Sequence, residues 1–134
     1  MPNASSIIKS PAISDSEWLV MSEFWRLGEA TVKTILGELE DKQTWQPTTV
    51  QTLINRLVQK GALGRRKEGR EFVYAPLVSQ DYCTHAVSRS FMDRVFGGRL
   101  APLLATFIEH QECSPDDLAE LKKLLEDKAH APRE

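Results

Sequence analysis

The side chains with the clearest binding chemistry lie on one face of a helix that the sequence predicts between Pro47 and a stop at Gly61. One stripe of this helix is apolar at helical spacing and should be buried: Val50, Leu53, Ile54, Leu57 and Gly61. The opposite face carries hydrogen-bonding groups and one cation: Thr48, Thr49, Gln51, Thr52, Asn55 and Arg56. A face that only meets solvent is usually rich in Glu and Lys, whereas Thr, Gln and Asn suit the base edges of a DNA major groove. We therefore expect base recognition, with Gln51 and Thr52 as the principal contacts.

A cluster of cations follows this helix directly, on two short strands that surround a turn at Lys67–Arg70. Its members are Arg65, Arg66, Lys67 and Arg70. Their place on a hairpin beside a DNA-reading helix predicts contacts with DNA phosphates, which position a protein without reading sequence. Tyr74, in the second strand, is expected to pack against the core.

The preceding segments supply the helices that would position these groups. Ser14 and Glu17 form a capping box that opens a first helix, which Gly28 should end. Thr31 is expected to cap a short second helix, and Pro47 stands at the first position of the third. Helix, short helix, turn, recognition helix and hairpin are the order of a winged helix-turn-helix. The predicted fold class is mainly α, with a small antiparallel β wing and a C-terminal helical region.

Three further helices are predicted after Pro76. Ser79 should cap a long helix that ends at Gly97–Gly98, residues 101–108 form a short apolar helix expected to be buried on most sides, and Ser114 begins the last one. Such helices have little reason to fold alone, so we interpret them as a homodimer interface. The residues expected in it are Val87, Phe91, Val95, Leu103, Leu104, Phe107, Leu118, Leu121 and Leu125.

Length and charge are consistent with this division. The chain has 134 residues and a net charge of −2, with cations gathered around the hairpin and acids toward the C-terminus. We expect a disordered N-terminus (1–12), a winged-helix DNA-binding domain (13–77), a helical dimerisation region (78–128) and a tail (129–134). No apolar run reaches the roughly 20 residues of a membrane span, and no signal peptide is evident. The sequence predicts a cytoplasmic protein without direct membrane association.

Two alternatives remain open from the residues. Cys83 and His85, and His110 and Cys113, have spacings that could bind a metal, which would make the chain a metal- or thiol-responsive transcriptional sensor. Cysteine on an apolar stripe more often acts as a small hydrophobe, so we predict no metal site and no cofactor. A winged helix can also serve as a protein-binding adaptor. No catalytic motif is found, and we expect no enzyme activity.

The segment from Trp45 to Gly61, WQPTTVQTLINRLVQKG, resembles the penicillinase-repressor family of bacterial regulators, the BlaI, MecI and CopY group. The opening helix at Ile13–Met21 and the Val95–Gly98 break are similar too, so the likeness covers about residues 13 to 128. The resemblance implies a homodimeric winged-helix repressor that binds a palindromic, double-stranded DNA operator.

The resemblance also implies a route of induction. In the β-lactam-responsive members, a membrane sensor-protease pathway leads to cleavage before a phenylalanine in the helix that corresponds to residues 103–109. The matching bond here joins Thr106 and Phe107, although those members have Asn at the first position. This chain departs from the family elsewhere. Gln46 is a poor cap, Thr48 and Gln51 stand where the best-known members carry Lys and Arg, and the tail lacks the cysteines of the copper-responsive branch.

Overall fold

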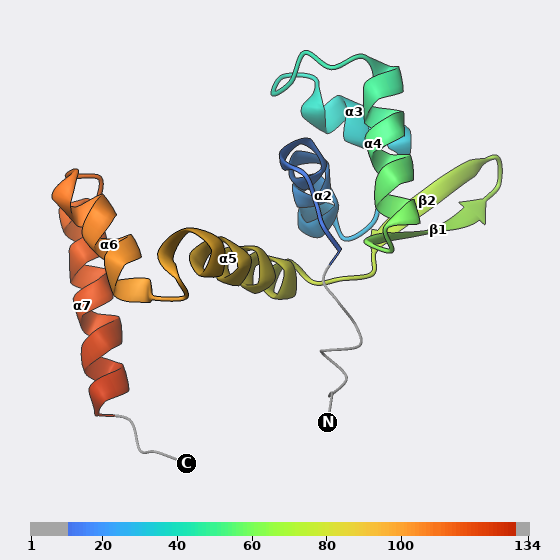
Figure 1. The fold of residues 1–134 in the computed structure, drawn as a ribbon. Coiled ribbons are helices and arrows are strands. Elements are labelled where there is room, and N and C mark those ends of the chain that lie inside the picture. Colours follow the sequence, from blue (N-terminus) through green and yellow to red (C-terminus); the bar gives the residue numbers. More distant parts are fainter. Residues whose placement is uncertain (1–10, 131–134) are drawn as a thin grey trace, which may run out of the picture. The chain divides into compact units, whose positions relative to one another are not determined.

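The computed structural model describes residues 11–130, whose contacts divide the chain into one unit that ends at Val87 and another that begins at Ser88 (Figure 1). The structure confirms the predicted fold class, because helices form most of it and the two strands make one antiparallel hairpin. Residues 1–10 and 131–134, which include most of the two expected tails, lie outside the described residues. Ala129, assigned to the tail from the sequence, is the last residue of a helix.

Three helices form the body of the first unit, and each begins where the sequence predicts, two at a capping side chain and α4 at its proline. Helix α2 spans Asp15–Leu27, and the box between Ser14 and Glu17 closes with bonds of 2.8 and 3.2 Å. Helix α3 spans Val32–Leu39, and the Thr31 hydroxyl accepts a hydrogen bond from the Thr34 amide. Helix α4 spans Pro47–Gln59, where proline tolerates the unpaired first turn.

The end of α4 corrects one expectation from the sequence. Gly61 is exposed and does not belong to the buried stripe. Its φ is +81°, and its amide donates to the Val58 carbonyl while the Ala62 amide donates to the Leu57 carbonyl. These two bonds are the usual helix ending at a left-handed glycine. The chain therefore turns inward one residue later, and Ala62 takes the buried place.

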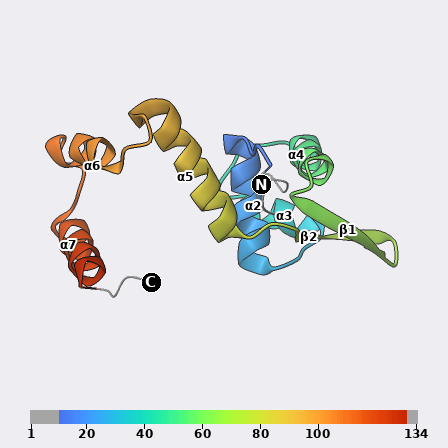
Figure 2. The same cartoon turned by 60° about the horizontal axis from the view of Figure 1, so that its bottom comes forward.

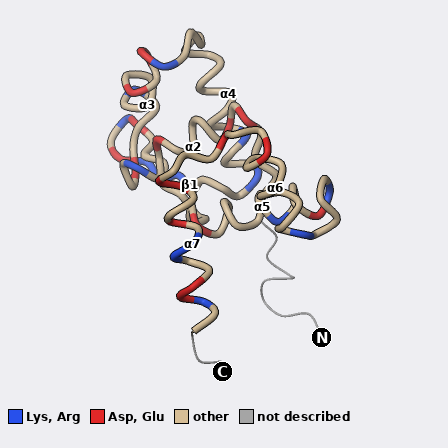
Figure 3. Tube along the Cα trace, turned by 90° about the vertical axis from the view of Figure 1, so that its left-hand side faces the viewer, with Lys and Arg blue, Asp and Glu red and all other residues tan. Residues whose placement is uncertain are grey.

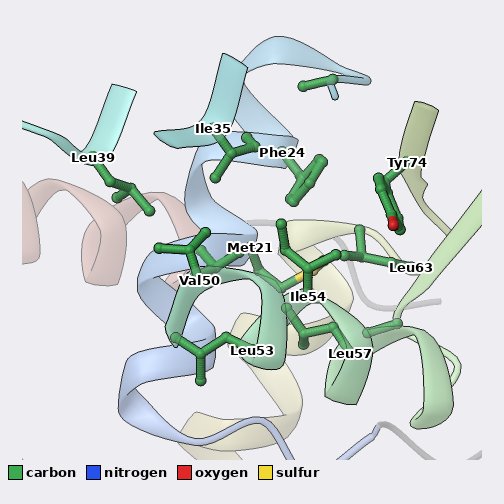
Figure 4. Close-up of a cluster of buried hydrophobic side chains, with 13 residues drawn as sticks. Met21, Phe24, Ile35, Leu39, Val50, Leu53, Ile54, Leu57, Leu63 and Tyr74 are labelled. Carbon is green, nitrogen blue, oxygen red and sulfur yellow. The ribbon is translucent and has the colours of Figure 1, made fainter. Parts of the chain in front are cut away.

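The core of the first unit lies where α2, α3, α4 and the base of the hairpin meet (Figure 4). Val50, Leu53, Ile54 and Leu57 of α4 are buried as predicted. They pack with Met21 and Phe24 of α2, Ile35 and Leu39 of α3, and Leu63 and Tyr74 of the hairpin. The apolar stripe of α4 thus faces inward, which fixes its polar face outward.

The hairpin consists of β1, Leu63–Glu68, and β2, Glu71–Pro76, paired antiparallel with Glu68 opposite Glu71. Gly69, with φ +63°, supplies the left-handed conformation of a tight turn. Ala30, in the turn between α2 and α3, bridges to Tyr74 with backbone bonds of 3.0 and 2.9 Å. Beyond this base the hairpin extends away from the helices (Figures 1 and 2).

Two glutamates are buried in the first unit, and both are paired. Glu17 is 1% exposed and accepts hydrogen bonds from the Lys60 ammonium and the Ser14 amide. Burial raises the pKa of Glu17, but the Lys60 and Ser14 bonds and the Lys60 charge outweigh it and leave that pKa lowered. Glu23, which is bonded to Arg26 and Lys42, shows the same balance and a lowered pKa. The two pairs join α2 to the segments around it.

Helix α5, Gln80–Phe96, begins in the first unit and ends in the second. Gly97 and Gly98 follow it with positive φ values, as the predicted break requires. Helix α6 spans Leu100–Glu109, and α7 spans Pro115–Ala129 behind a capping box of Ser114 and Asp117. Basic and acidic residues alternate along α7 (Figure 3). None of the described helices is long and apolar enough to cross a membrane.

The C-terminal helices are exposed in the single chain. None of the described residues of α6 is buried, and Leu100, Phe107 and Ile108 are each more than 40% exposed, so the predicted burial of α6 stays a prediction for the dimer. The single chain leaves these side chains in contact with solvent. The first unit by contacts extends to Val87, because Cys83 is buried and the Trp25 indole donates to the Val78 carbonyl at 2.9 Å. The division into a DNA-binding domain (13–77) and a dimerisation region (78–128) stays a prediction.

Candidate nucleic-acid interface

The outward face of α4 presents short polar side chains on a rigid helix. Thr48, Thr49, Thr52, Asn55 and Arg56 are all exposed. Gln59 continues the same face one turn after Asn55 and is also exposed, although sequence analysis did not include it. Its i+4 spacing from Asn55 was the signal that could have identified it. The face is therefore a continuous row of hydrogen-bonding groups.

Gln51 lies at the edge of this face. It is half-buried, and its amide nitrogen donates to the Asn55 side-chain oxygen at 2.9 Å. Thr52 donates its hydroxyl to the Thr48 carbonyl at 2.9 Å, which fixes that side chain against the helix. The two residues named as principal base contacts thus both hold a defined orientation. Gln51 keeps its carbonyl oxygen and one amide hydrogen for another partner.

A small hollow of about 210 Å³ adjoins Gln51 on the hairpin side of α4. Its lining comes from the start of α3, from α4 and from β2: Thr31, Val32, Lys33, Gln51, Glu71, Phe72 and Tyr74. Phe72 is 40% exposed, whereas Tyr74 is 2% exposed and packs edge-on against Phe24. The expectation that Tyr74 packs in the core is confirmed.

The alternation of strand residues divides the cations of the hairpin between its two faces. Arg65 and Lys67 share a face with Phe72 and Tyr74, as the strand register requires. The guanidinium carbon of Arg65 lies 4.5 Å from the centre of the Phe72 ring, a cation–π contact that orients the side chain. Arg66 and Glu68 share the other face with Glu71 and Val73.

Arg66 is bound to carboxylates on this second face. Its two terminal nitrogens donate to Glu29 at 3.3 and 2.7 Å, and one also donates to Glu68 at 2.8 Å. The hydrogen bond from Arg66, together with its charge, lowers the pKa of Glu29. Lys60, at the end of α4, is likewise paired inside the unit, with Glu17. Lys67 and Arg70 are exposed near the tip.

The residues considered for metal or thiol sensing differ in their burial, and they belong to two different units. Cys83 is 1% exposed in the first unit, while His85 on the same helix is exposed. His110 ends α6 in the second unit, and its ring bonds the Thr106 carbonyl at 2.8 Å. Within residues 11–130, no three or more His, Cys, Asp or Glu residues are grouped so that they could hold a metal ion.

The apolar residues predicted for dimerisation are mostly exposed. Val87, Phe91 and Val95 are 50%, 40% and 53% exposed along α5, and Leu118 and Leu125 are 43% and 65% exposed on α7. Leu103, Leu104 and Leu121 are half-buried. Exposed apolar side chains in such number are typical of a protein–protein interaction surface, and the dimer interface stays a prediction.

Comparison with known proteins identifies the group to which the chain is related. The sequence profile of the family described as "Penicillinase repressor" matches residues 13–127. The chain belongs to the penicillinase repressor family. It is 36% identical over 126 residues to the penicillinase repressor of Bacillus licheniformis, covering 94% of this chain and 98% of that one. It is 33% identical over 120 residues to the methicillin resistance regulatory protein MecI of Staphylococcus aureus, covering 90% and 98%.

A solved structure extends the family likeness to the fold of the first unit. The DNA binding domain of the repressor BlaI is similar with a TM-score of 0.50 and 43% identity, covering 54% of this chain and 88% of that domain. The first unit is therefore a winged helix-turn-helix domain. In the terms of this family, α3 and α4 are the helix-turn-helix and the β1–β2 hairpin is the wing.

Proposed function

We propose that this protein is a sequence-specific, DNA-binding transcriptional repressor that acts as a homodimer on a palindromic operator. The observation that carries the proposal is the pairing of an exposed Thr and Asn face on α4 with a wing whose Arg65 and Lys67 lie on the α4-facing surface. Neutral donors and acceptors can read base edges, and cations can hold phosphates. The family's repressors support this assignment. Under the proposed function the chain would act in the cytoplasm, where its DNA is, and would have no catalytic role.

Base readout is assigned to α4 and positioning to the wing. Thr48, Thr52 and Asn55 occupy the centre of the exposed face, with Gln51, Thr49 and Arg56 at its edges. Arg65, Lys67 and Arg70 would contact DNA phosphates beside the bases that α4 reads. A repressor of this kind blocks transcription by occupying its site, so its affinity and specificity are the quantities to measure.

Dimerisation would cover the exposed side chains of α5, α6 and α7. A symmetric pair of chains doubles the apolar surface removed from water, and it presents two α4 helices to successive major grooves. Half-sites should then be related by an inverted repeat, about one or two helical turns apart.

The test is selection of bound duplexes from a random pool by the full-length chain. We expect enrichment of an inverted repeat, and specific binding to it that exceeds binding to scrambled duplex by at least about a thousandfold. A chain carrying Thr48→Ala, Gln51→Ala, Thr52→Ala and Asn55→Ala is the matched control, which should still bind duplex but enrich no sequence. A parent chain that enriches no sequence would contradict the proposal.

We further propose that induction cuts α6 between Thr106 and Phe107. In the single chain Thr106 is exposed and Phe107 is 42% exposed, but the proposed dimer covers α6, so protease access requires local opening of the dimer as well as unwinding of the helix. The helix also begins weakly, since the Arg99 side chain makes no capping bond within the described chain. Mass analysis of the protein after induction of its native operon should find both fragments. Phe107→Ala should block the cut, and Phe91→Ala should not. An intact chain that has left its operator would contradict this route.

A further inference from the structure

The wing presents its three adjacent cations in two different electrostatic settings. Arg65 and Lys67 lie on the face that continues toward α4, where Phe72 supports the Arg65 guanidinium. Arg66 lies on the opposite face, among Glu29, Glu68 and Glu71. Sequence alone treats the three as equivalent, but strand alternation separates them.

The Arg66 contacts connect parts of the chain that are far apart in sequence. Glu29 lies in the turn between α2 and α3, 37 positions before Arg66, and next to Ala30, which bridges to β2. The Arg66 side chain therefore reaches from β1 across β2 to this turn. A two-stranded hairpin is only marginally stable by itself. The Arg66–Glu29 contact, which lies beyond the base of the hairpin, therefore restricts the motion of the two strands near the turn.

We propose that Arg66 is a positioning residue that holds the wing to the α2–α3 turn through Glu29, and that it does not neutralise a DNA phosphate. This inference rests on the proposed DNA-binding function and refines it. The Arg66 charge is already matched by two carboxylates, whose bonds a phosphate would have to break. Exposed ion pairs contribute little singly, but a two-pronged arginine within a network is the arrangement that contributes most.

The salt dependence of operator binding separates the two roles. Each neutralised phosphate contributes about 0.9 to the slope of log affinity against log salt concentration. Arg65→Gln, a matched change at the adjacent position, should reduce the slope by about 1. Arg66→Gln should weaken binding about fivefold at low salt, which is the upper end for an exposed ion-pair network, and should change the slope by much less than 1.

Replacing Glu29, the partner of Arg66 in the α2–α3 turn, gives a second test of the proposal. Removing a negative charge near DNA would normally tighten binding, but Glu29→Gln should weaken it about as much as Arg66→Gln does. The double variant should be no weaker than either single variant, because both remove the same contact. Backbone amide exchange in residues 63–76 should rise in both single variants and stay at the parent level in Arg65→Gln.

Three results would overturn the inference. They are a slope reduced by about 1 in Arg66→Gln, tighter operator binding by Glu29→Gln, or additive losses in the double variant. Thermal unfolding of each variant identifies any that fails to fold. If Arg66→Gln fails to fold, Arg66→Lys replaces it, and this variant should keep the parent slope and lose part of the operator affinity. Failure of the proposed function looks different, because the parent chain itself would then show no preference for its selected operator.

Discussion

At the scale of single residues, the interface combines side chains that are held and side chains that are free to meet solvent. Gln51 is bonded to Asn55, Thr52 is bonded to its own helix, and Arg65 rests on Phe72. Such restraint lowers the entropy that must be lost on binding. Arg56, Lys67 and Arg70 are exposed, and long exposed cations suit phosphate contacts whose geometry is loose.

Gln51 is expected to determine one base of the operator. Its side chain can form two hydrogen bonds with adenine, so Gln51→Ala should cost about 1–3 kcal/mol at one operator position and relax discrimination there. Binding of the variant to operators with each base at every position measures this effect. Gln80→Ala, at an exposed position on α5, is the control. Equal losses on operator and scrambled DNA would show that Gln51 only positions the helix.

Glu17 should make the stability of the first unit depend on pH. Its folded pKa lies below the ordinary value of 4.5, so its stabilising effect is complete above about pH 5 and is lost as pH falls through the folded pKa. Glu17→Gln should lower the free energy of unfolding at pH 7 by about 1–3 kcal/mol, since Lys60 loses its charged partner, and should flatten the acid dependence.

Urea unfolding of the full chain between pH 7 and pH 3 measures both effects of Glu17. Glu40→Gln, an exposed change in the same unit, is the control and should follow the parent curve. If Glu17→Gln lost stability on acidification as steeply as the parent does, another group would be responsible for the acid dependence.

At the scale of elements, helix ends decide where the interface groups point. The left-handed Gly61 ends α4 and returns the chain into β1, so the recognition helix and the wing are joined by a turn of fixed geometry. The Ala30 bridge then joins the wing to the turn before α3. The predicted DNA contacts on α4 and on the wing thus belong to one connected unit.

Two glycines offer a paired test of this reasoning. Gly61→Ala should destabilise the first unit by about 1–2 kcal/mol, because its φ of +81° strains any L side chain even though no atom lies within 4 Å of the added carbon. Gly37→Ala, within α3 and with equally open space, should stabilise by up to about 1 kcal/mol. Thermal unfolding compares the two variants, and a stabilised Gly61→Ala would contradict the proposed constraint.

At the scale of the whole molecule, the proposed function assigns DNA recognition to the first unit and dimer assembly to the second. The first has a closed apolar core, whereas no described residue of α6 or α7 is buried. Helices that stay apolar and exposed gain stability by pairing with a second chain. We therefore expect a dimer whose stability depends on protein concentration.

Replacing Leu118 and Leu125 with Glu should separate the dimer without altering the first unit. A charge at each position opposes burial, so sedimentation should show a monomer. Affinity for the full palindrome should fall by about a hundredfold or more, while affinity for a single half-site should be unchanged. Lys122→Glu, on the same helix, is the control. A variant that stays dimeric would place the interface on other residues.

The sequence by itself determined the local features: the capping boxes, the proline at the start of α4, the glycine stops and the apolar stripe that turns Thr48, Thr52 and Asn55 outward. These features depend on neighbours within a few residues, so the local pattern contains enough information to predict them. The tertiary structure decided the features that depend on distant partners. It paired Arg66 with Glu29 and Lys60 with Glu17, because contacts between residues 37 or 43 positions apart exist only once the chain has folded. It also decided that Gln51 lies half-buried at the edge of the polar face and that α6 is exposed in the single chain, because burial depends on which elements pack together.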